Sequence, residues 1–549
     1  MDQSSITLHL THSLYKQLPG RPVESEEISH IHALRGETVS VQVIAAMTGA
    51  GRVQVDAEVQ SPLPFRLRRV MTVPVRLAAY PDSHDDGYLS VEPGLYPDLL
   101  ADYAPGSRCW VTRLEPLNFW IDFTVPASQP AGDYPMVFRL HGDESDAAQE
   151  IRLTVTVLAA ELPPQTLKCT QWFHSDCLAD YYHVSVFSPE YWRIIENFMR
   201  AAVQSGTNMI LTPIFTPALD TAVGSERTTV QLVDVTVNAD GTYAFGFDRL
   251  LQWVNLAHRV GITDFEMAHL FTQWGAKFCP KIMAHTPQGD RRIFGWADDA
   301  DGDRYVTFLR AFLPALTAKL REWGIAAHCT FHISDEPSAE ALPHYLKLRE
   351  IVLPLIPGFR VMDALSHYGF YEQGAVDIPV AALDAAQPFV DHHVEPLWVY
   401  YCCGQGQSHE SNRFIAMPSV RNRVLGFQMY LEGVSGFLHW GFNYYNDCCS
   451  AHHIDPFLTA DGDSAYPAGD PFLIYPGEGG VPLGSIRQMV FAEAIQDQRA
   501  CRLLEQKIGR DRVCEMIRSA GIRGFLDYPM DAAALLALRG EINAAIARA

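Results

Sequence analysis

One pattern recurs along the middle of the chain and limits the folds that the chain can adopt. A segment with helical hydrophobic periodicity ends at a glycine, and a short apolar run follows it directly. The pattern occurs at Gly206 before "TNMILTPI", at Gly261 before "ITDFEMAHL" and at Gly324 before "IAAHCTFHIS". Helices that alternate with buried strands are typical of βα units on a parallel sheet. The sequence therefore predicts an α/β domain in the middle of the chain.

The starts of these helices support the prediction. Ser188, Pro189 and Glu190 supply an N-cap, a proline at the first helical position and an early acid. The other two helices are expected to begin near Asp248 and Asp303. In the first helix, one face carries the apolar residues Trp192, Ile195, Met199 and Ala202.

Five further apolar segments bring the number of predicted strands to eight. They are "CTQWFHSD" before the first helix, then "FRVMDALSH", "PFVDHHV", "LWVYYCC" and "SGFLHWGFN" after the third. Eight strands that alternate with helices predict a (β/α)8 barrel of the TIM type over residues 168–484. An open doubly wound sheet is the alternative, and it is disfavoured because no glycine-rich phosphate loop follows any of these strands.

The flanking segments have other patterns. Residues 1–160 contain short runs such as "RVQVDAEVQ" and "QEIRLTVTVL" that alternate apolar and polar side chains, which predicts an antiparallel β-sandwich. The proline-containing segment "ELPPQTLK" (161–168) is expected to link this domain to the barrel. Residues 485–549 have helical periodicity and are predicted to form a C-terminal helical segment that packs on the barrel.

The charge of the chain narrows its possible partners. The 64 acidic residues exceed the 42 lysine and arginine residues, which gives a formal net charge of −22. Such a surface repels phosphate groups and anionic lipid, so neither nucleic acid nor a membrane is expected as a partner. The first residues lack the features of a signal peptide, and no apolar stretch is long enough to span a bilayer. The 11 cysteines lack the spacing of a disulfide framework, and together these features predict a cytoplasmic location.

Polar and aromatic residues gather at the predicted carboxyl ends of the strands, where barrel enzymes have their active sites. Carboxylates, imidazoles and aromatic rings together suit a sugar, because rings pack on its C–H faces while carboxylates bind hydroxyl groups and transfer protons. The candidates are His174, Asp176, Asn208, Glu266, His269, Asp335, Glu336, Asp363, His367, Tyr400, Tyr401, Trp440 and Asn443.

Asp335 and Glu336 are adjacent acids that Pro337 follows directly. On a regular strand adjacent side chains point to opposite faces, but in the last residues before a loop both can turn toward the barrel opening. Two close carboxylates cannot both ionise freely, so the pair separates an acid from a base, as glycosidic cleavage requires. The alternative is that Asp335 caps a helix that begins near Ser338, while Glu336 faces solvent.

Three segments carry a resemblance to a known family. "CTFHISDEP" resembles the catalytic strand of the β-N-acetylgalactosaminidases of glycoside hydrolase family 123. The stretch from "LWVYYCCGQGQSHESNRF" to "GFLHWGFNYYN" resembles the C-terminal part of the barrel in that family and its uncharacterised relatives, and so does "GDPFLIYPGEGGVPLGSIR". The resemblance covers about residues 168–500, and the sandwich expected before the barrel fits the layout of the family.

The resemblance implies a retaining exo-hydrolase of β-linked N-acetylgalactosamine, or of a related 2-acetamido sugar, with a glycan or glycoconjugate as substrate. In the implied reaction the acetamido oxygen of the substrate attacks the anomeric carbon and forms an oxazolinium ion, so no enzyme nucleophile is needed. By position in the motif, Glu336 is implied to be the general acid and then the base. Asp335 is implied to hold the acetamido N–H and to stabilise the oxazolinium ion. No cofactor is expected, and the family's common export signal is not seen here.

Six residues are candidate substrate contacts. The segments that match the family contain Tyr400, Trp440 and Asn443. The predicted strand ends add His174, Asn208 and His269. Three tryptophans are expected either in the core or in the wall of the cleft, namely Trp172, Trp274 and Trp296.

Two other functions fit the same residues. A conventional retaining glycosidase would use Glu336 as its acid and either Glu266 or Asp176 as its nucleophile, and it would cleave sugars without an acetamido group. A non-catalytic glycan-binding protein would keep the barrel and bind without turnover. The intact pair of Asp335 and Glu336 argues against this second alternative.

The segment "DCCSAHH" (447–453) contains thiols and imidazoles of the kind that bind zinc. Cys448 and Cys449 are adjacent, however, and lack the two-residue gap that lets both thiolates reach one ion. No metal site is therefore predicted, and these residues are expected to be buried cysteines in a polar loop. Cys402 and Cys403 are likewise expected to pack inside the barrel rather than to act as nucleophiles.

Overall fold

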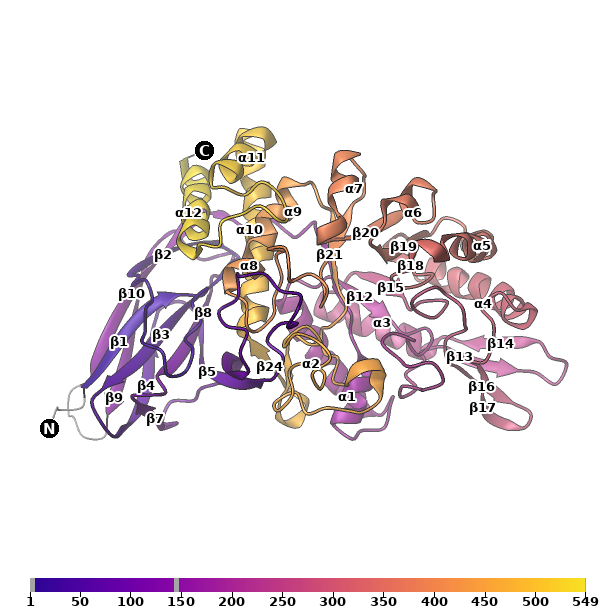
Figure 1. Ribbon diagram of the computed structural model, residues 1–549, viewed down its shortest axis with the longest axis horizontal. Helices are drawn as coiled ribbons and strands as arrows, with labels where there is room; N and C mark the ends of the chain where they lie inside the picture. Colours follow the sequence, from indigo (N-terminus) through magenta and orange to yellow (C-terminus); the bar gives the residue numbers. More distant parts are fainter. Residues whose placement is uncertain (1–4, 143–147, 549) are drawn as a thin grey trace.

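Figure 1 shows the computed structural model, which describes residues 5–142 and 148–548. The chain begins in a domain of two sheets, continues into an α/β barrel, and ends in helices that lie against both parts. Among the described residues, no helix is both long enough and apolar enough to cross a membrane.

The first N-terminal sheet contains β1 (Ser5–His12), β3 (Thr38–Thr48), β8 (Leu117–Thr124), β5 (Phe65–Val75), β6 (Gly94–Asp102), β24 (Pro482–Ser485) and β23 (Tyr475–Pro476), in that order. The second contains β2 (His30–Arg35), β10 (Gln149–Glu161), β9 (Gly132–Gly142), β4 (Arg52–Gln60) and β7 (Cys109–Thr112). One hydrophobic cluster holds buried side chains of both sheets, such as Phe119 of the first and Phe138 of the second. The two sheets therefore share a single core.

Two features of these sheets depart from the predicted antiparallel domain. β10 pairs with β2 in parallel, whereas the other pairings are antiparallel. Most of the domain separates β2 from β10 in sequence, so no hairpin forces them to run in opposite directions. In addition, β23 and β24 follow the barrel in sequence, yet they extend the first sheet at its β6 edge.

Eight strands close the barrel, which confirms the predicted TIM-type fold. In order they are β11 (Lys168–Gln171), β12 (Met209–Thr212), β15 (Asp264–Met267), β18 (Cys329–Phe331), β19 (Arg360–Leu365), β20 (Ile378–Ala382), β21 (Trp398–Tyr400) and β22 (Gly436–His439). All neighbours are parallel, and β22 pairs with β11 to complete the ring.

Seven of the eight predicted strand segments contain a barrel strand, and the prediction for "PFVDHHV" is wrong. This segment forms α7 (Gln387–Asp391), with Pro388 in its first turn, where a missing N–H costs nothing. The sixth strand is β20, whose apolar run contains Pro379. Proline in a run argues against a central strand, which is why the sequence pattern hid it.

The helices around the barrel are α1 (Ser175–Tyr181), α2 (Pro189–Gln204), α3 (Asp248–Val260), α4 (Asp303–Glu322), α5 (Leu342–Val352), α6 (Tyr368–Glu372), α7, α8 (Ser419–Arg423) and α9 (Leu425–Leu431). Three of them, α2, α3 and α4, begin where the sequence predicts. The Ser188 hydroxyl accepts a hydrogen bond of 3.2 Å from the Tyr191 N–H and caps α2. Gly261 ends α3 with a φ of 107°, which glycine adopts without a Cβ clash.

Two insertions after barrel strands form a small sheet at the end of the molecule farthest from the N-terminal domain (Figure 1). It contains β14 (Tyr243–Gly246), β13 (Asp234–Val237), β16 (Ile282–Thr286) and β17 (Gly289–Phe294). The loop that precedes β13 contributes a pocket residue, Asp220, as described below.

The C-terminal helices are α10 (Ile486–Ile508), α11 (Arg510–Ser519) and α12 (Ala532–Arg548). α10 contacts α8 and α9 of the barrel and also β6, whereas α12 contacts β2 and β10. Buried Arg539 in α12 forms ion pairs with Glu37 of the N-terminal domain at 2.8 Å and with Asp497 of α10 at 2.6 Å. These helices therefore join the barrel to the two-sheet domain.

Candidate active site

A pocket opens at the carboxyl ends of the barrel strands, where the fold predicts an active site. Four lining residues come from strand ends or from the loops after them. Trp172 follows β11, Asp335 lies in the loop after β18, Tyr400 ends β21 and Trp440 follows β22. Its lining also includes Leu219, Asp220, Gln273, Trp274, Glu336, Ala364, Cys402, Cys403, Leu438 and Tyr466.

Asp335 and Glu336 both face this pocket, as predicted for acids at a strand end. Glu336 has a φ of +40°, in the left-handed region that side chains other than glycine rarely adopt. The pair lies in the loop after β18, where the regular alternation of a strand no longer applies and both side chains can face the same pocket. The N–H of Trp274 donates a hydrogen bond of 2.9 Å to the Asp335 carbonyl and holds the turn. The capping alternative does not occur, since the 3-10 turn that follows has Ser338 at its N-cap.

The two acids have different neighbours. The Tyr400 hydroxyl donates a hydrogen bond of 2.5 Å to Oε1 of Glu336. Burial raises the pKa of Glu336, although this hydrogen bond acts in the opposite direction. Burial and the negative charge of Glu336 raise the pKa of Asp335 well above its usual range. Both carboxyl groups are therefore shifted toward their protonated forms.

A buried charge network lies behind Asp335. His332, fully buried, contacts Glu266 through Nε2 at 2.8 Å and Asp363 through Nδ1 at 2.9 Å. Burial by itself would lower the pKa of His332, but the hydrogen bonds with Asp363 and Glu266 outweigh it and raise the pKa to about 10. The imidazolium ion acts on Asp335 in turn, and its positive charge favours the ionised carboxylate there.

Asp363 also holds the segment that leads to the acid pair. Its Oδ2 accepts hydrogen bonds from the N–H of Ile333 at 3.1 Å and of Ser334 at 3.3 Å. The Tyr345 hydroxyl donates to the same oxygen. Asp363 thus fixes the backbone of the two residues that precede Asp335. Asp363 itself does not line the pocket.

Of the predicted sugar contacts, Tyr400 and Trp440 line the pocket, while His174 and Asn443 lie behind it. The Asn443 side chain accepts from the His174 N–H at 2.9 Å and donates to the His174 carbonyl at 3.0 Å. Burial and the nearby Arg227 lower the pKa of His174 to about 3, so its ring is neutral. That ring contacts the Trp440 carbonyl at 2.8 Å and the Arg227 guanidinium at 3.0 Å. His174 and Asn443 therefore position Trp440.

The other two predicted contacts are farther from the pocket. The ring of His269 stacks on that of His332, with centroids 4.3 Å apart, and it is buried. Asn208 precedes β12 rather than following it, and its side chain bonds Cys169 N–H at 2.8 Å and the Leu167 carbonyl at 3.0 Å. The structure therefore corrects the predicted position of Asn208, which lies at the amino end of the barrel, opposite the pocket.

The two candidate nucleophiles of a conventional retaining glycosidase, Glu266 and Asp176, lie outside the pocket and are bonded to other residues. Glu266 is fully buried and accepts hydrogen bonds from the Thr170 hydroxyl and, at 3.2 Å, from the Trp172 ring N–H. Asp176 forms a buried two-point ion pair with Arg227 at 2.7 and 2.8 Å. Neither carboxylate lines the pocket. Two further strand-end candidates also lie outside it, since His367 is exposed at the start of α6 and Tyr401 is buried.

Among the described residues, the pocket has a third carboxylate that sequence reasoning missed. Asp220 accepts hydrogen bonds from the hydroxyl groups of Tyr444 at 2.5 Å and Tyr466 at 2.6 Å. Like Glu336, Asp220 and Trp274 have positive φ values, of 41° and 57°. Backbone strain of this kind gathers at functional sites. Asp220 lies in a loop without a motif, and its tyrosine partners are more than 200 residues away, so no local signal marks it.

The tryptophans and cysteines divide between wall and core. Trp172 and Trp274 line the pocket, and Trp274 is 55% exposed, whereas Trp296 does not line it. Cys402 and Cys403 also line the pocket and are partly exposed, which corrects their expected packing inside the barrel. The hydrogen bond with Cys403, together with burial, raises the pKa of Cys402 well above its usual range, so it is a thiol and a poor nucleophile.

The catalytic-domain model of the Glycoside hydrolase 123 family matches residues 172–504 of this chain. One similar solved structure is a family 123 glycoside hydrolase from Clostridium perfringens, described for glycolipid glycan hydrolysis, with 14% sequence identity and a TM-score of 0.75. The match covers 99% of this chain and 98% of that chain, and it shows a shared fold. No curated protein sequence matches this chain.

Two other solved structures resemble the chain much less. A β-glucuronidase from Parabacteroides merdae is 9% identical, with a TM-score of 0.31, over 90% of this chain and 54% of that chain. An endo-β-1,4-mannanase from Thermotoga petrophila is 12% identical, with a TM-score of 0.33, over 61% of this chain and 77% of that chain. Similarity at this level carries no argument about function.

Proposed function

Because this chain belongs to the glycoside hydrolase 123 family, we propose that it is a retaining exo-hydrolase of β-linked N-acetylgalactosamine or a related 2-acetamido sugar. The substrate is a glycan or glycoconjugate. The observation that carries the proposal is the placement of Asp335 and Glu336 side by side in one pocket, with different hydrogen-bond partners. Two adjacent acids suit a reaction in which the substrate supplies its own nucleophile.

Glu336 is the proposed general acid. Burial raises the pKa of Glu336, which is the direction that an acid catalyst near neutral pH requires. The Tyr400 hydroxyl donates to Oε1, so the proton is carried on Oε2. Oε2 then delivers this proton to the leaving glycosidic oxygen.

Asp335 is the proposed partner of the acetamido group. Its carboxylate accepts the acetamido N–H, which turns the acetamido oxygen toward the anomeric carbon. Burial raises the pKa of Asp335, but when Glu336 holds the proton Asp335 no longer faces that second negative charge, and the His332 imidazolium favours the ionised form. The negative carboxylate then stabilises the positive charge of the oxazolinium ion.

The reaction has two steps with Glu336 active in both. In the first, the acetamido oxygen bonds to the anomeric carbon as the bond to the leaving oxygen breaks, and that oxygen takes the proton from Glu336. In the second, the Glu336 carboxylate removes a proton from water, and the water oxygen attacks the anomeric carbon from the face that the leaving group vacated. The oxazolinium ring opens, the acetamido group is restored, and the configuration is retained.

The pocket walls support a sugar ligand. Trp274 and Trp440 offer partly exposed aromatic faces of the kind that pack on sugar C–H groups. Asp220 is the remaining carboxylate in the described lining, and a conventional double displacement would have to use it as nucleophile. Its Oδ2 already accepts hydrogen bonds from two tyrosine hydroxyl groups, which engage the lone pairs that an attack on the sugar would need.

Hydrolysis of three aryl glycosides tests the proposal. The purified protein is assayed with aryl β-N-acetylgalactosaminide, aryl β-N-acetylglucosaminide and aryl β-galactoside. We expect turnover of one or both acetamido sugars and little or none of the galactoside. Equal or faster hydrolysis of the galactoside would rule out the acetamido group as nucleophile.

A further inference from the structure

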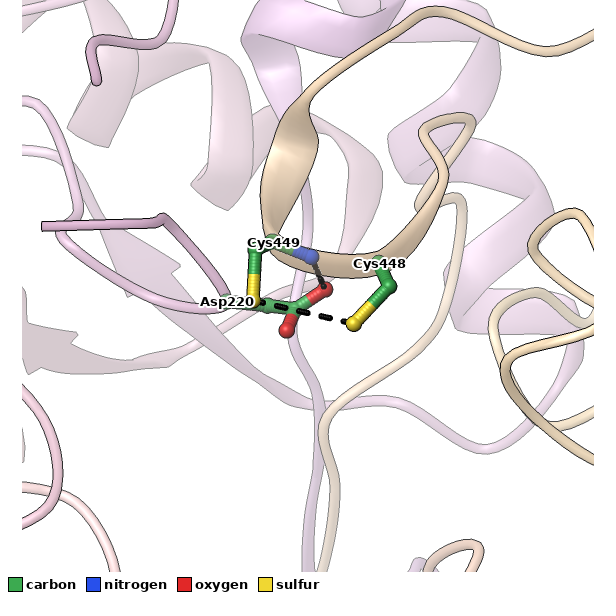
Figure 2. A group of neighbouring side chains, drawn as sticks. All are labelled: Asp220, Cys448 and Cys449. Atoms are coloured by element: carbon green, nitrogen blue, oxygen red, sulfur yellow. Dashed lines mark hydrogen bonds between the residues drawn. The ribbon is translucent and has the colours of Figure 1, made fainter.

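Two segments from different parts of the barrel meet beside the pocket and bring two thiols next to Asp220 (Figure 2). The 3-10 turn Cys448–Ser450 lies against the loop that carries Asp220. The Cys449 N–H donates to Oδ2 of Asp220 at 3.2 Å, and the Ser450 hydroxyl donates to the Asp220 carbonyl at 2.8 Å. The Ala222 N–H donates to the Cys449 carbonyl at 3.1 Å. Protein contacts alone therefore hold the three side chains together.

The turn overcomes the obstacle that led the sequence to predict no metal site. Side chains of adjacent residues diverge on a regular strand, but Cys449 adopts φ 58° and ψ 24°. The sulfur atoms of Cys448 and Cys449 consequently lie only 3.6 Å apart. With Zn–S bonds of about 2.3 Å, two thiolates of a tetrahedral zinc site lie about 3.8 Å apart. The observed separation matches that requirement closely.

Asp220 is suited to complete the site. One carboxylate oxygen of Asp220 and the sulfur atoms of Cys448 and Cys449 all lie within 4.8 Å of one another. Its Oδ2 accepts from the hydroxyl groups of Tyr444 and Tyr466, while among the described residues none donates to Oδ1. Outer hydrogen bonds of this kind orient a carboxylate that binds a metal through its other oxygen.

We propose that Asp220, Cys448 and Cys449 bind a zinc ion, with the fourth position open to solvent. Two thiolates with one carboxylate are a ligand set for a borderline-soft cation, whereas Mg²⁺ and Ca²⁺ take oxygen ligands. Cys448 is exposed, so an ion can enter from solvent. Binding releases the thiol protons and sets three negative ligands against two positive charges.

A second group of possible ligands, formed by His269, His332 and Asp363, does not compete as a site. Both ring nitrogens of His332 already bond to carboxylates, and its ring is cationic at neutral pH. A cationic imidazole has no free lone pair for a metal.

Zinc at this position would act on the pocket, since Asp220 lines it together with Asp335. The proposed substrate is a sugar, and an Asp220 oxygen that binds zinc can no longer accept a hydrogen bond from a sugar hydroxyl group in that pocket. Zinc is therefore expected to inhibit hydrolysis. This consequence rests on the proposed function, whereas the site itself does not.

Cobalt(II) titration of the full chain, reduced with a phosphine, tests the site directly. Co²⁺ replaces Zn²⁺ in thiolate sites and produces thiolate-to-cobalt charge-transfer absorption together with strong visible bands in tetrahedral geometry. We expect one Co²⁺ per chain with both signals, and their loss when Zn²⁺ is added. Co²⁺ that binds without a charge-transfer band would overturn the proposal.

Variants assign the signal to these residues. Cys448→Ala is expected to weaken Co²⁺ binding more than about tenfold and to remove most of the charge-transfer absorption. Its side chain is exposed, so the fold should survive, as a melting temperature verifies. The isosteric Asp220→Asn provides a second test and should weaken binding similarly. Cys514→Ala, which removes a thiol from α11 outside the pocket, is the matched control and should keep the full signal.

An unchanged cobalt spectrum in Cys448→Ala and in Asp220→Asn would overturn the site. The activity arm is separate, because zinc should inhibit sugar hydrolysis by the wild type and by Cys514→Ala but not by Cys448→Ala. A cobalt signal in a protein that hydrolyses no acetamido sugar would contradict the proposed function while the metal site stands.

Discussion

The hydroxyl group of Tyr400, at the end of β21, donates a hydrogen bond of 2.5 Å to Oε1 of Glu336, in the loop after β18. The two strands are not neighbours in the barrel, so the contact spans the opening of the pocket. It links one member of the acid pair to the opposite wall. Its partner Asp335 is instead under the influence of the His332 imidazolium.

This contact predicts a change in the pH profile of Tyr400→Phe. The hydroxyl favours the ionised form of Glu336, so its removal raises the pKa of Glu336 further. The high-pH limb of kcat/KM reports the loss of the acid proton and should move to higher pH, by up to about one pH unit. A limb that stays in place, or moves to lower pH, would show that Tyr400 does not act on the catalytic acid.

Glu336→Gln is expected to lose activity by about a hundred- to ten-thousandfold on a substrate with a poor leaving group, because no proton reaches the glycosidic oxygen. A substrate whose leaving group departs as an anion should be spared in its first step. Steady-state assays with aryl leaving groups of graded acidity measure this difference. Wild-type turnover on the poor leaving group would disprove the assignment of Glu336.

Asp335→Asn should reduce the hydrolysis of 2-acetamido sugars far more than that of a plain galactoside. The amide keeps the size of the side chain but removes the charge that stabilises the oxazolinium ion, at a cost of about 3 kcal/mol in the transition state. The measurement is the ratio of kcat/KM for the two sugars in wild type and variant, with melting temperatures as the control for folding. An unchanged ratio would mean that Asp335 does not contact the acetamido group.

A thiazoline analogue of N-acetylgalactosamine is expected to inhibit strongly, because it mimics the bicyclic intermediate and such mimics bind more tightly than substrates. A double displacement would instead be trapped by a 2-fluoro sugar, with Asp220 as the carboxylate available in the described pocket. Intact-protein mass spectrometry separates the two cases. A covalent 2-fluoroglycosyl adduct would eliminate the substrate-assisted mechanism.

Arg539→Ala should lower the free energy of unfolding by about 3–5 kcal/mol, since it leaves the buried carboxylate of Glu37 without its cation and leaves Asp497 paired with Arg423 alone. Thermal unfolding measures the loss. Arg548→Ala, at the exposed end of the same helix, is the matched control and should change stability by less than about 0.5 kcal/mol. Similar melting temperatures for the two variants would show that the interface between α12 and the N-terminal domain does not depend on this ion pair.

Local signals in the sequence determine much of the barrel. Examples are the Ser188 cap, the helix end at Gly261 and the apolar runs between them. Each depends on residues that are close in the chain, so each can be predicted without knowledge of the fold. Strand β20 is the exception, because Pro379 breaks its apolar run and burial on both faces removes any alternation. The acid pair is also local, since Asp335 and Glu336 are adjacent and end a strand segment.

The surroundings of the acid pair come from the tertiary structure alone. Closure of the barrel brings Tyr400 onto Glu336 across a separation of 64 residues, and it brings Tyr444 onto Asp220 across 224 residues. The same closure leaves His174 and Asn443 behind the wall. There the Asn443 side chain bonds the His174 backbone, and the His174 ring bonds the Trp440 carbonyl and Arg227.

The sequence by itself thus determined α2, α3, α4 and the helical C-terminal segment, most of the strands and the position of the two acids, because each depends on neighbours along the chain. The third carboxylate, the tyrosines that bind it and the two convergent thiols were decided only by the tertiary structure. Their positions follow from contacts between distant loops and from the positive φ of Cys449, which turns two adjacent side chains to one side. Sequence spacing carries no information about either kind of contact, because it records neither the path of a loop nor its backbone angles.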